Sequence, residues 1–140
     1  MSKFKLKKIE VVAAVIESSS KILCVQRKIS TLKYISEKWE FPGGKIEPGE
    51  NHATALSREI SEELQVKVNV KERLMTINHQ YPDFLVIMHA YYCDLLNVES
   101  AVILKVHQNL VWLSPFDLDF LNLDWAEADI PIVQALHKKA

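Results

Sequence analysis

The three glycines of this 140-residue chain are concentrated in one short segment, residues 39–50 (WEFPGGKIEPGE). The same segment contains two of the five prolines. Glycine reaches backbone conformations that are closed to other residues, and proline fixes φ. Their concentration therefore predicts a loop of defined shape rather than a flexible linker.

Residues 51–64 (NHATALSREISEEL) follow this loop directly and predict a helix with Asn51 as its N-cap. Apolar residues recur there at spacings of three, four and four, which places them on one face of the helix. These residues are Ala53, Leu56, Ile60 and Leu64.

The remaining elements follow from apolar, β-branched runs separated by turn residues. The predicted strands cover residues 9–17, 21–28, 66–80, 84–95 and 110–113. The triple serine 18–20 and the sequence Tyr81-Pro82-Asp83 predict the turns of two hairpins. Residues 29–38, 96–109 and 114–127 predict irregular connections, and residues 128–139 predict a final helix. This order predicts an α+β fold with a mixed β-sheet flanked by helices, in a single domain over residues 1–140.

Composition narrows the class of protein. The net charge is -1, so no global basic field attracts a nucleic acid polymer or an anionic membrane. No apolar run approaches the length of a membrane span. Cys24 and Cys93 lie in apolar segments without a C-x-x-C spacing, which is typical of buried, reduced thiols in a cytoplasmic protein.

The predicted helix 51–64 also carries an acidic face. Glu59, Glu62 and Glu63 have i, i+3, i+4 spacing, and each like-charged pair costs roughly 0.2–0.5 kcal/mol. Such a run is often only a solvated face. Next to a glycine-rich loop, however, clustered carboxylates favour a site for Mg²⁺, with Mn²⁺ as the alternative. The five histidines show no metal-ligand spacing, and we expect them not to be ligands.

The segment Gly44-x5-Glu50-x7-Arg58-Glu59-Ile60-x-Glu62-Glu63-x-x-Val66 resembles the Nudix box, G-x5-E-x7-R-E-U-x-E-E-x-G-U, where U is a bulky aliphatic residue. Gln65 replaces the usual glycine just past the helix end, where a left-handed conformation costs a non-glycine residue roughly 1 kcal/mol. Residues 39–47 are similar to the MutT branch of the family. Residues 107–112 and 128–131 look like its CTP pyrophosphohydrolase type. The resemblance implies the Nudix fold, an α/β/α sandwich.

The resemblance also implies roles for individual residues. Glu59, Glu62, Glu63 and the Gly43 carbonyl are the implied metal ligands. Glu59 is also implied to orient or deprotonate the attacking water, and Arg58 to position the glutamates. Glu50 is either an anchor between loop and helix or an alternative base.

Other implied roles concern the substrate. Arg27 and Lys45 are implied to contact phosphates, and Tyr81 and Asp129 to contact the base; alternatively, Arg27 is a surface charge and Asp129 only a helix-terminal acid. MutT-type enzymes often take an acidic ligand from the segment after the last long strand, and here the matching position is Val106. Water, Asp94 or Glu99 is the expected substitute.

These roles together imply a Mg²⁺-dependent nucleoside triphosphate pyrophosphohydrolase that releases a nucleoside monophosphate and pyrophosphate. Its expected substrates are 8-oxo-dGTP or CTP and dCTP, in sanitation of the nucleotide pool. An ADP-ribose or nucleotide-sugar pyrophosphatase is the enzymatic alternative. A non-catalytic Nudix-like domain that senses nucleotides or binds a protein is the other. The expected partners exclude nucleic acid polymers and membranes, and the protein is expected to be a monomer or homodimer.

Overall fold

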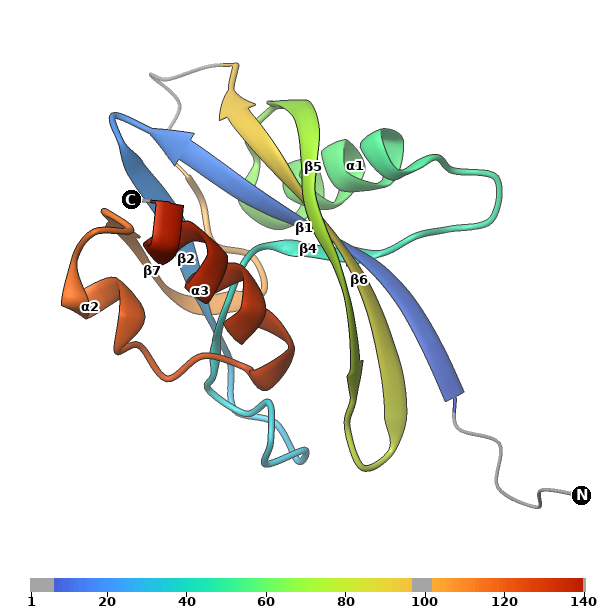
Figure 1. Cartoon of the computed structure of the whole chain (residues 1–140). Coiled ribbons are helices and arrows are strands. Elements are labelled where there is room, and N and C mark those ends of the chain that lie inside the picture. The colour runs from blue at the N-terminus through green and yellow to red at the C-terminus, as the bar shows by residue number, and fades with distance from the viewer. Residues whose placement is uncertain (1–6, 97–101, 140) are drawn as a thin grey trace, which may run out of the picture.

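A computed structural model describes residues 7–96 and 102–139 (Figure 1). Its strands are β1 (Lys7–Ser18), β2 (Lys21–Arg27), β3 (Trp39–Glu40), β4 (Gly43–Lys45), β5 (Val68–Gln80), β6 (Phe84–Leu95) and β7 (His107–Leu113). Its helices are α1 (His52–Leu64), the short α2 (Leu118–Leu121), the 3-10 turn η1 (Glu127–Asp129) and α3 (Ile130–Lys139). No helix among these residues has the length and apolar character needed to cross a membrane.

The strands form one mixed sheet in the order β3-β2-β1-β6-β5, with β4 added to β1 and β7 to β2. β1 and β6 run parallel, whereas the other pairs are antiparallel. β1 and β2 pair only at their tip, through Glu17 with Ile22 and Ser18 with Lys21. Beyond the tip the two strands diverge, and each pairs with another strand.

Two cores lie on opposite faces of the sheet because side chains alternate along a strand. Figure 1 shows α1 behind the sheet and α3 in front of it. Even-numbered residues of β1 pack with α1 and odd-numbered ones with α3. The α1 core includes Val12, Ala14, Ile16, Leu56, Ile60 and Leu64. The α3 core includes Ala13, Val15, Ile132, Val133 and Leu136. The expected mixed sheet flanked by helices is confirmed.

The N-cap predicted at Asn51 is confirmed. The Asn51 side chain accepts a hydrogen bond from the Thr54 N–H at 2.8 Å, as an N-cap does. Gln65 ends the helix with φ 55° and ψ 35°, so the left-handed conformation common just past a helix end is kept here without a glycine. Cys24 and Cys93 are buried and unpaired, and burial raises the pKa of each thiol to about 12.

Four details of the sequence interpretation are wrong. Ala53 is exposed beside a surface depression, and Ala55 is buried in its place. The loop 39–50 contains β3 and β4, which are too short to show periodicity. The strand expected at 110–113 begins at His107, because the polar residues 107–109 pair with β2. The connection 114–127 contains α2, which buries Phe120, and residues 97–101 of the other expected connection lie outside the described residues.

Candidate active site

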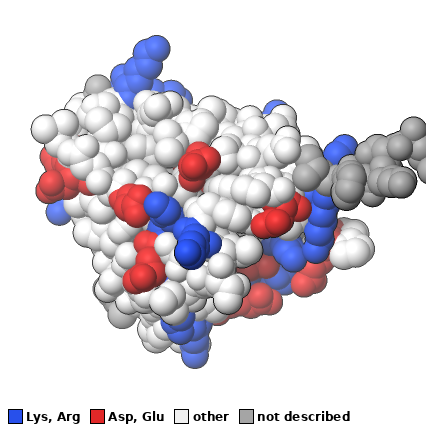
Figure 2. All heavy atoms as spheres, turned by 90° about the horizontal axis from the view of Figure 1, so that it is seen from below, with Lys and Arg blue, Asp and Glu red and all other residues white. Residues whose placement is uncertain are grey.

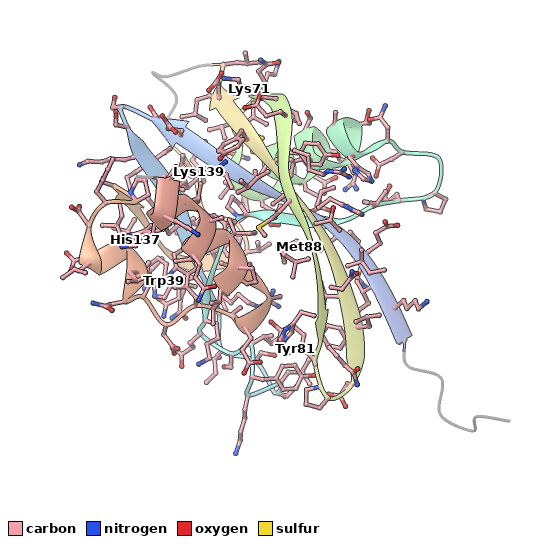
Figure 3. All side chains as sticks on the ribbon, viewed as in Figure 1. Trp39, Lys71, Tyr81, Met88, His137 and Lys139 are labelled. Carbon is pink, nitrogen blue, oxygen red and sulfur yellow. The ribbon has the colours of Figure 1, made fainter. Side chains whose placement is uncertain are left out.

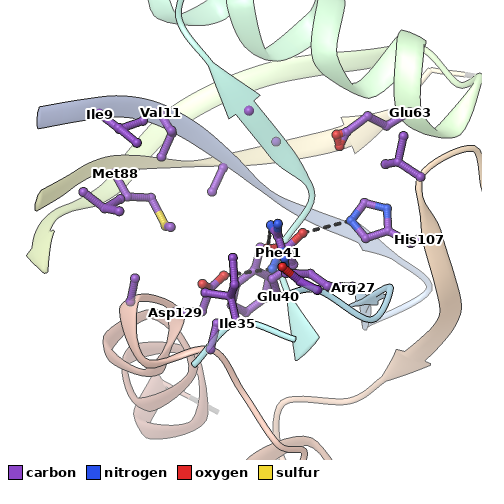
Figure 4. Close-up of a pocket in the computed structure, with 18 of the residues that line it drawn as sticks. Ile9, Val11, Arg27, Ile35, Glu40, Phe41, Glu63, Met88, His107 and Asp129 are labelled. Carbon is purple, nitrogen blue, oxygen red and sulfur yellow. Dashed lines mark hydrogen bonds and ion pairs between the residues drawn. The ribbon is translucent and has the colours of Figure 1, made fainter. Parts of the chain in front are cut away.

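A pocket lies where β1 and β2 diverge, on the α3 side of the sheet (Figure 4). Its volume is about 510 Å³, within the range of small-molecule sites. Odd-numbered side chains of β1 form an apolar floor, which includes Ile9 and Val11. In Figure 4, Glu63 and His107 lie at one end and Asp129 at the other.

The two consecutive glycines of β4 allow close approaches that a side chain would prevent. A Cβ atom at Gly43 would lie 1.9 Å from the Val12 carbonyl oxygen, so β4 can pair with β1 only if this residue is glycine. A Cβ atom at Gly44 would lie 2.4 Å from the Glu59 carboxylate. Gly44 therefore makes room for a helix side chain beside the pocket wall.

Arg58 connects the loop to the acidic helix face. Its Nε and Nη2 donate to the two oxygens of Glu50 at 2.7 and 2.8 Å. Nη2 also donates to the Lys45 carbonyl at 3.1 Å, and Nη1 donates to Glu59 Oε1 at 3.0 Å. The Arg58 hydrogen bonds lower the pKa of Glu50 to about 2. Glu50 is thus held charged with both oxygens engaged, a geometry that fixes Arg58 and, through it, Glu59.

The three helix glutamates have different surroundings. Glu63 lines the pocket, and burial, followed by the charges of Glu59 and Glu40, raises its pKa to about 8. Burial also raises the pKa of Glu59. The Glu62 side chain is 60% exposed and accepts a bond from Arg58 at 3.4 Å.

These surroundings fit a divalent cation. A group of carboxylates that raise one another's pKa favours a bound positive charge, and oxygen ligands are what Mg²⁺ and Mn²⁺ take. The absence of a side chain at Gly44 lets the Glu59 carboxylate lie next to the main chain, so that carboxylate and backbone carbonyl oxygens can serve one ion.

The opposite end of the pocket combines aromatic rings with one buried acid. Asp129 is 2% exposed, and its Oδ2 accepts from the Phe41 N–H at 2.9 Å. Burial, followed by the charge of Glu40, raises the pKa of Asp129. The hydroxyl of Tyr81 accepts from the Ala128 N–H at 3.0 Å, and Figure 3 places Tyr81 near the tip of the β5–β6 hairpin. These residues offer hydrogen bonds and an apolar surface to a flat ring.

Sequence reasoning assigned no role to Glu40 or His107, yet both line the pocket. Arg27 Nη1 donates to Glu40 Oε1 at 3.2 Å, and His107 Nε2 lies 2.9 Å from Glu40 Oε2 (Figure 4). Glu40 belongs to the segment 39–47 that resembles the MutT branch, and this resemblance could have indicated a role for it in the site. His107 reaches it only through the pairing of β7 with β2.

Two expected positions lie elsewhere. The side chain of Lys45 is exposed and does not line the pocket, although its carbonyl binds Arg58. Asp94, an expected substitute at Val106, pairs with Lys71 at 3.5 Å and does not line the pocket either. Val106 lines the pocket and is 50% exposed, while Glu99 lies outside the described residues.

The pocket therefore brings together Gly43, Glu63, Arg27, Tyr81 and Asp129. Glu59, Arg58 and Glu50 form a connected network behind Gly44, and Glu62 lies at its exposed edge. On the face in Figure 2, acidic and basic side chains are interspersed over a largely uncharged surface. This face therefore carries no patch of a single charge that would attract a charged ligand.

Comparisons with known proteins agree with this geometry. The NUDIX domain family matches residues 7–136. The chain is 37% identical over 130 residues to the CTP pyrophosphohydrolase of Escherichia coli K12, covering 93% of this chain and 92% of that one. It is 36% identical over 78 residues to the 8-oxo-dGTP diphosphatase of Proteus vulgaris, covering 55% of this chain and 68% of that one. The solution structure of a MutT protein from methicillin-resistant Staphylococcus aureus 252 matches with 40% identity and a TM-score of 0.71, covering 97% of this chain and all of that one. The chain belongs to the Nudix family, and it is a Nudix hydrolase.

Proposed function

We propose that this Nudix hydrolase converts a nucleoside triphosphate to its monophosphate and pyrophosphate with Mg²⁺. The observation that carries the proposal is one continuous pocket with an acidic end at Glu63 and an aromatic, hydrogen-bonding end at Asp129 and Tyr81. A nucleotide has a matching arrangement, with a charged phosphate chain at one end and a flat base at the other. Residues 1–140 act in this proposal as a single domain.

The acidic end would hold the cation through Glu59, Glu62, Glu63 and the Gly43 carbonyl. A bound divalent ion supplies charge neutralisation on the departing pyrophosphate and a lowered pKa of bound water. Glu59 would orient or deprotonate the water, which attacks a phosphorus within the triphosphate as pyrophosphate leaves. Arg58 Nη1 holds Glu59 Oε1 at 3.0 Å, which would leave Oε2 for the attacking water.

Glu50 would act as an anchor rather than as the base. Both of its oxygens receive bonds from Arg58, and Oε1 also accepts from the Glu47 N–H at 2.9 Å. A carboxylate with this many donors is a weak proton acceptor.

The phosphate chain would lie along Arg27, which already reaches into the pocket through Glu40. Lys45, on the exposed side of β4, would contact the terminal phosphates only after a change of side-chain conformation.

The other end would recognise the base. Asp129 Oδ2 is engaged by Phe41, so Oδ1 would accept from an exocyclic amine or, when protonated, donate to a ring carbonyl. Those two states suit cytosine and 8-oxoguanine respectively, the bases named by the Escherichia coli and Proteus vulgaris relatives. CTP or dCTP and 8-oxo-dGTP are therefore the proposed substrates, with a role in sanitation of the nucleotide pool.

A substrate panel tests the proposal. Purified protein with Mg²⁺ would be incubated with 8-oxo-dGTP, CTP, dCTP, ADP-ribose and a dinucleoside polyphosphate, and the products identified. We expect pyrophosphate and a monophosphate in equal amounts from at least one triphosphate, with the largest losses in Glu59→Gln and Glu63→Gln. A preference for ADP-ribose would contradict the substrate class but not the reaction class. Absence of turnover on every compound would contradict both.

A further inference from the structure

A second group of ligand-type side chains lies on the α1 side of the sheet. Glu10 on β1, His52 at the start of α1 and His89 on β6 each offer one ligand atom, and these atoms lie within 4.8 Å of one another. Among the described residues this is the set of three acidic, histidine or cysteine side chains that converges so closely. None of the three lines the nucleotide pocket, which opens on the α3 side.

Each histidine already has its Nδ1 atom fixed by a hydroxyl. His52 Nδ1 lies 2.6 Å from the Tyr91 hydroxyl, and His89 Nδ1 lies 2.9 Å from Thr76 Oγ1. Metal-binding histidines in proteins almost always bond their second ring nitrogen in this way, because the bond fixes the tautomer and the ring orientation. In both residues the nitrogen left for an ion is therefore Nε2.

The three donors also suit the approach of an ion. His89 Nε2 lies 2.7 Å from Glu10 Oε2, and the two imidazole rings stack with centroids 4.2 Å apart. The Glu10 side chain is 53% exposed, which gives solvent access to an otherwise half-buried cluster.

We propose that Glu10, His52 and His89 form a second metal site, for a divalent transition ion of the Zn²⁺ class. Two imidazole nitrogens and one carboxylate, with water in the fourth position, are a common zinc ligand set. Mg²⁺ prefers oxygen ligands and would not compete there.

Binding of an ion requires the three side chains to rearrange. Tetrahedral bonds of about 2.0–2.1 Å place donors roughly 3.3 Å apart. The 2.7 Å separation of His89 and Glu10 must therefore widen slightly. The exposed Glu10 side chain can provide this movement. Donor atoms that now lie up to 4.8 Å apart must also draw closer, which requires the two stacked imidazole rings to turn. The ion would connect β1, β6 and the start of α1. Its ligand on α1, His52, lies two positions after Glu50.

The test is a calorimetric titration of the whole chain with Zn²⁺ in a large excess of Mg²⁺, which saturates the oxygen-rich site. We expect one equivalent to bind. Glu10→Gln and His52→Gln each remove one ligand and should weaken binding by at least about tenfold, and Tyr91→Phe by about 10–100-fold, because it removes a partner of a ligand. His137→Gln is the matched control: its ring contacts the Pro115 carbonyl far from the cluster, and its affinity should equal that of the wild type.

Far-UV circular dichroism of each variant without Zn²⁺ separates loss of a ligand from loss of folding, and Glu10→Gln alters an exposed side chain that the fold tolerates. Co²⁺ in place of Zn²⁺ should give the intense visible absorption of a tetrahedral site with nitrogen ligands. Absence of stoichiometric binding in Mg²⁺ would overturn the proposal. Equal affinity in the wild type, Glu10→Gln and His52→Gln would also overturn it, since the ion would then bind elsewhere. The result does not depend on the proposed substrate, so either proposal can fail alone.

Discussion

The substitution Gly44→Ala should disturb the geometry of the active site and leave the stability of the fold nearly unchanged. The new Cβ atom would lie 2.4 Å from the Glu59 carboxylate, whereas ordinary contacts begin at 3.4 Å. The carboxylate must therefore move by about 1 Å, the difference between these two distances. A misplacement of about 1 Å in a reacting group can lower a rate on the order of 100-fold.

Folding should be little affected by this substitution, because the atom that must move is the end of a side chain. Gly44 is in an extended strand without a positive φ, which alanine adopts readily. Gly49→Ala is the matched control. Gly49 has φ of 83°, and an added Cβ atom there would meet no neighbour within 4 Å. Alanine at this position should therefore cost roughly 1–2 kcal/mol of stability and leave Glu59 in place.

The assay measures kcat from pyrophosphate release at saturating Mg²⁺ and triphosphate, together with urea unfolding of each variant. We expect Gly44→Ala to lose activity and keep its unfolding midpoint, and Gly49→Ala to show the reverse. Activity of Gly44→Ala within twofold of the wild type would refute the reasoning, as would equal losses of activity in the two variants.

Three further predictions follow from individual residues. Arg58→Lys cannot form both bonds to Glu50 and should lower kcat by about 10–100-fold, measured by the same assay; an unchanged kcat would exclude a positioning role. Gln65→Gly should raise the free energy of unfolding by roughly 1 kcal/mol with kcat unchanged, because it relieves a left-handed residue, and urea denaturation would detect the gain or its absence. Burial raises the pKa of Asp129 above its unfolded value near 3.8, so its contribution is fully present below that pH and is lost as pH rises through the folded pKa. Urea midpoints measured against pH should therefore fall more steeply in the wild type than in Asp129→Asn, and parallel curves would contradict the assignment.

Local chemistry allowed correct predictions wherever neighbours in the sequence decide the structure. The Asn51 cap and the hairpin turn at Tyr81-Pro82-Asp83 each depend on a few consecutive residues. Ala53 was misplaced because helical spacing gives a face but not the point at which that face reaches the sheet.

Long-range contacts account for what the sequence could not show. His107 and Glu40 are 67 positions apart, and His89 and Glu10 are 79 apart. Neither pair has a spacing motif, because each forms only when the sheet brings distant strands together. The Nudix box, in contrast, allowed the acidic helix to be located from the sequence. Its loop and helix are adjacent in the chain, and Arg58 joins them directly.

In the proposed function, carboxylates of α1 carry a Mg²⁺-dependent hydrolysis of a triphosphate. The most direct measurement is kcat/KM for 8-oxo-dGTP and CTP, with and without Mg²⁺, in the wild type, Glu63→Gln and the exposed β5 control Glu72→Gln. We predict turnover only with Mg²⁺, a loss of about 100-fold or more in Glu63→Gln, and wild-type values in Glu72→Gln, since metal-held transition-state charge contributes several kcal/mol. Equal turnover in Glu63→Gln and the wild type, or turnover that persists after Mg²⁺ is removed by a chelator, would contradict the claim.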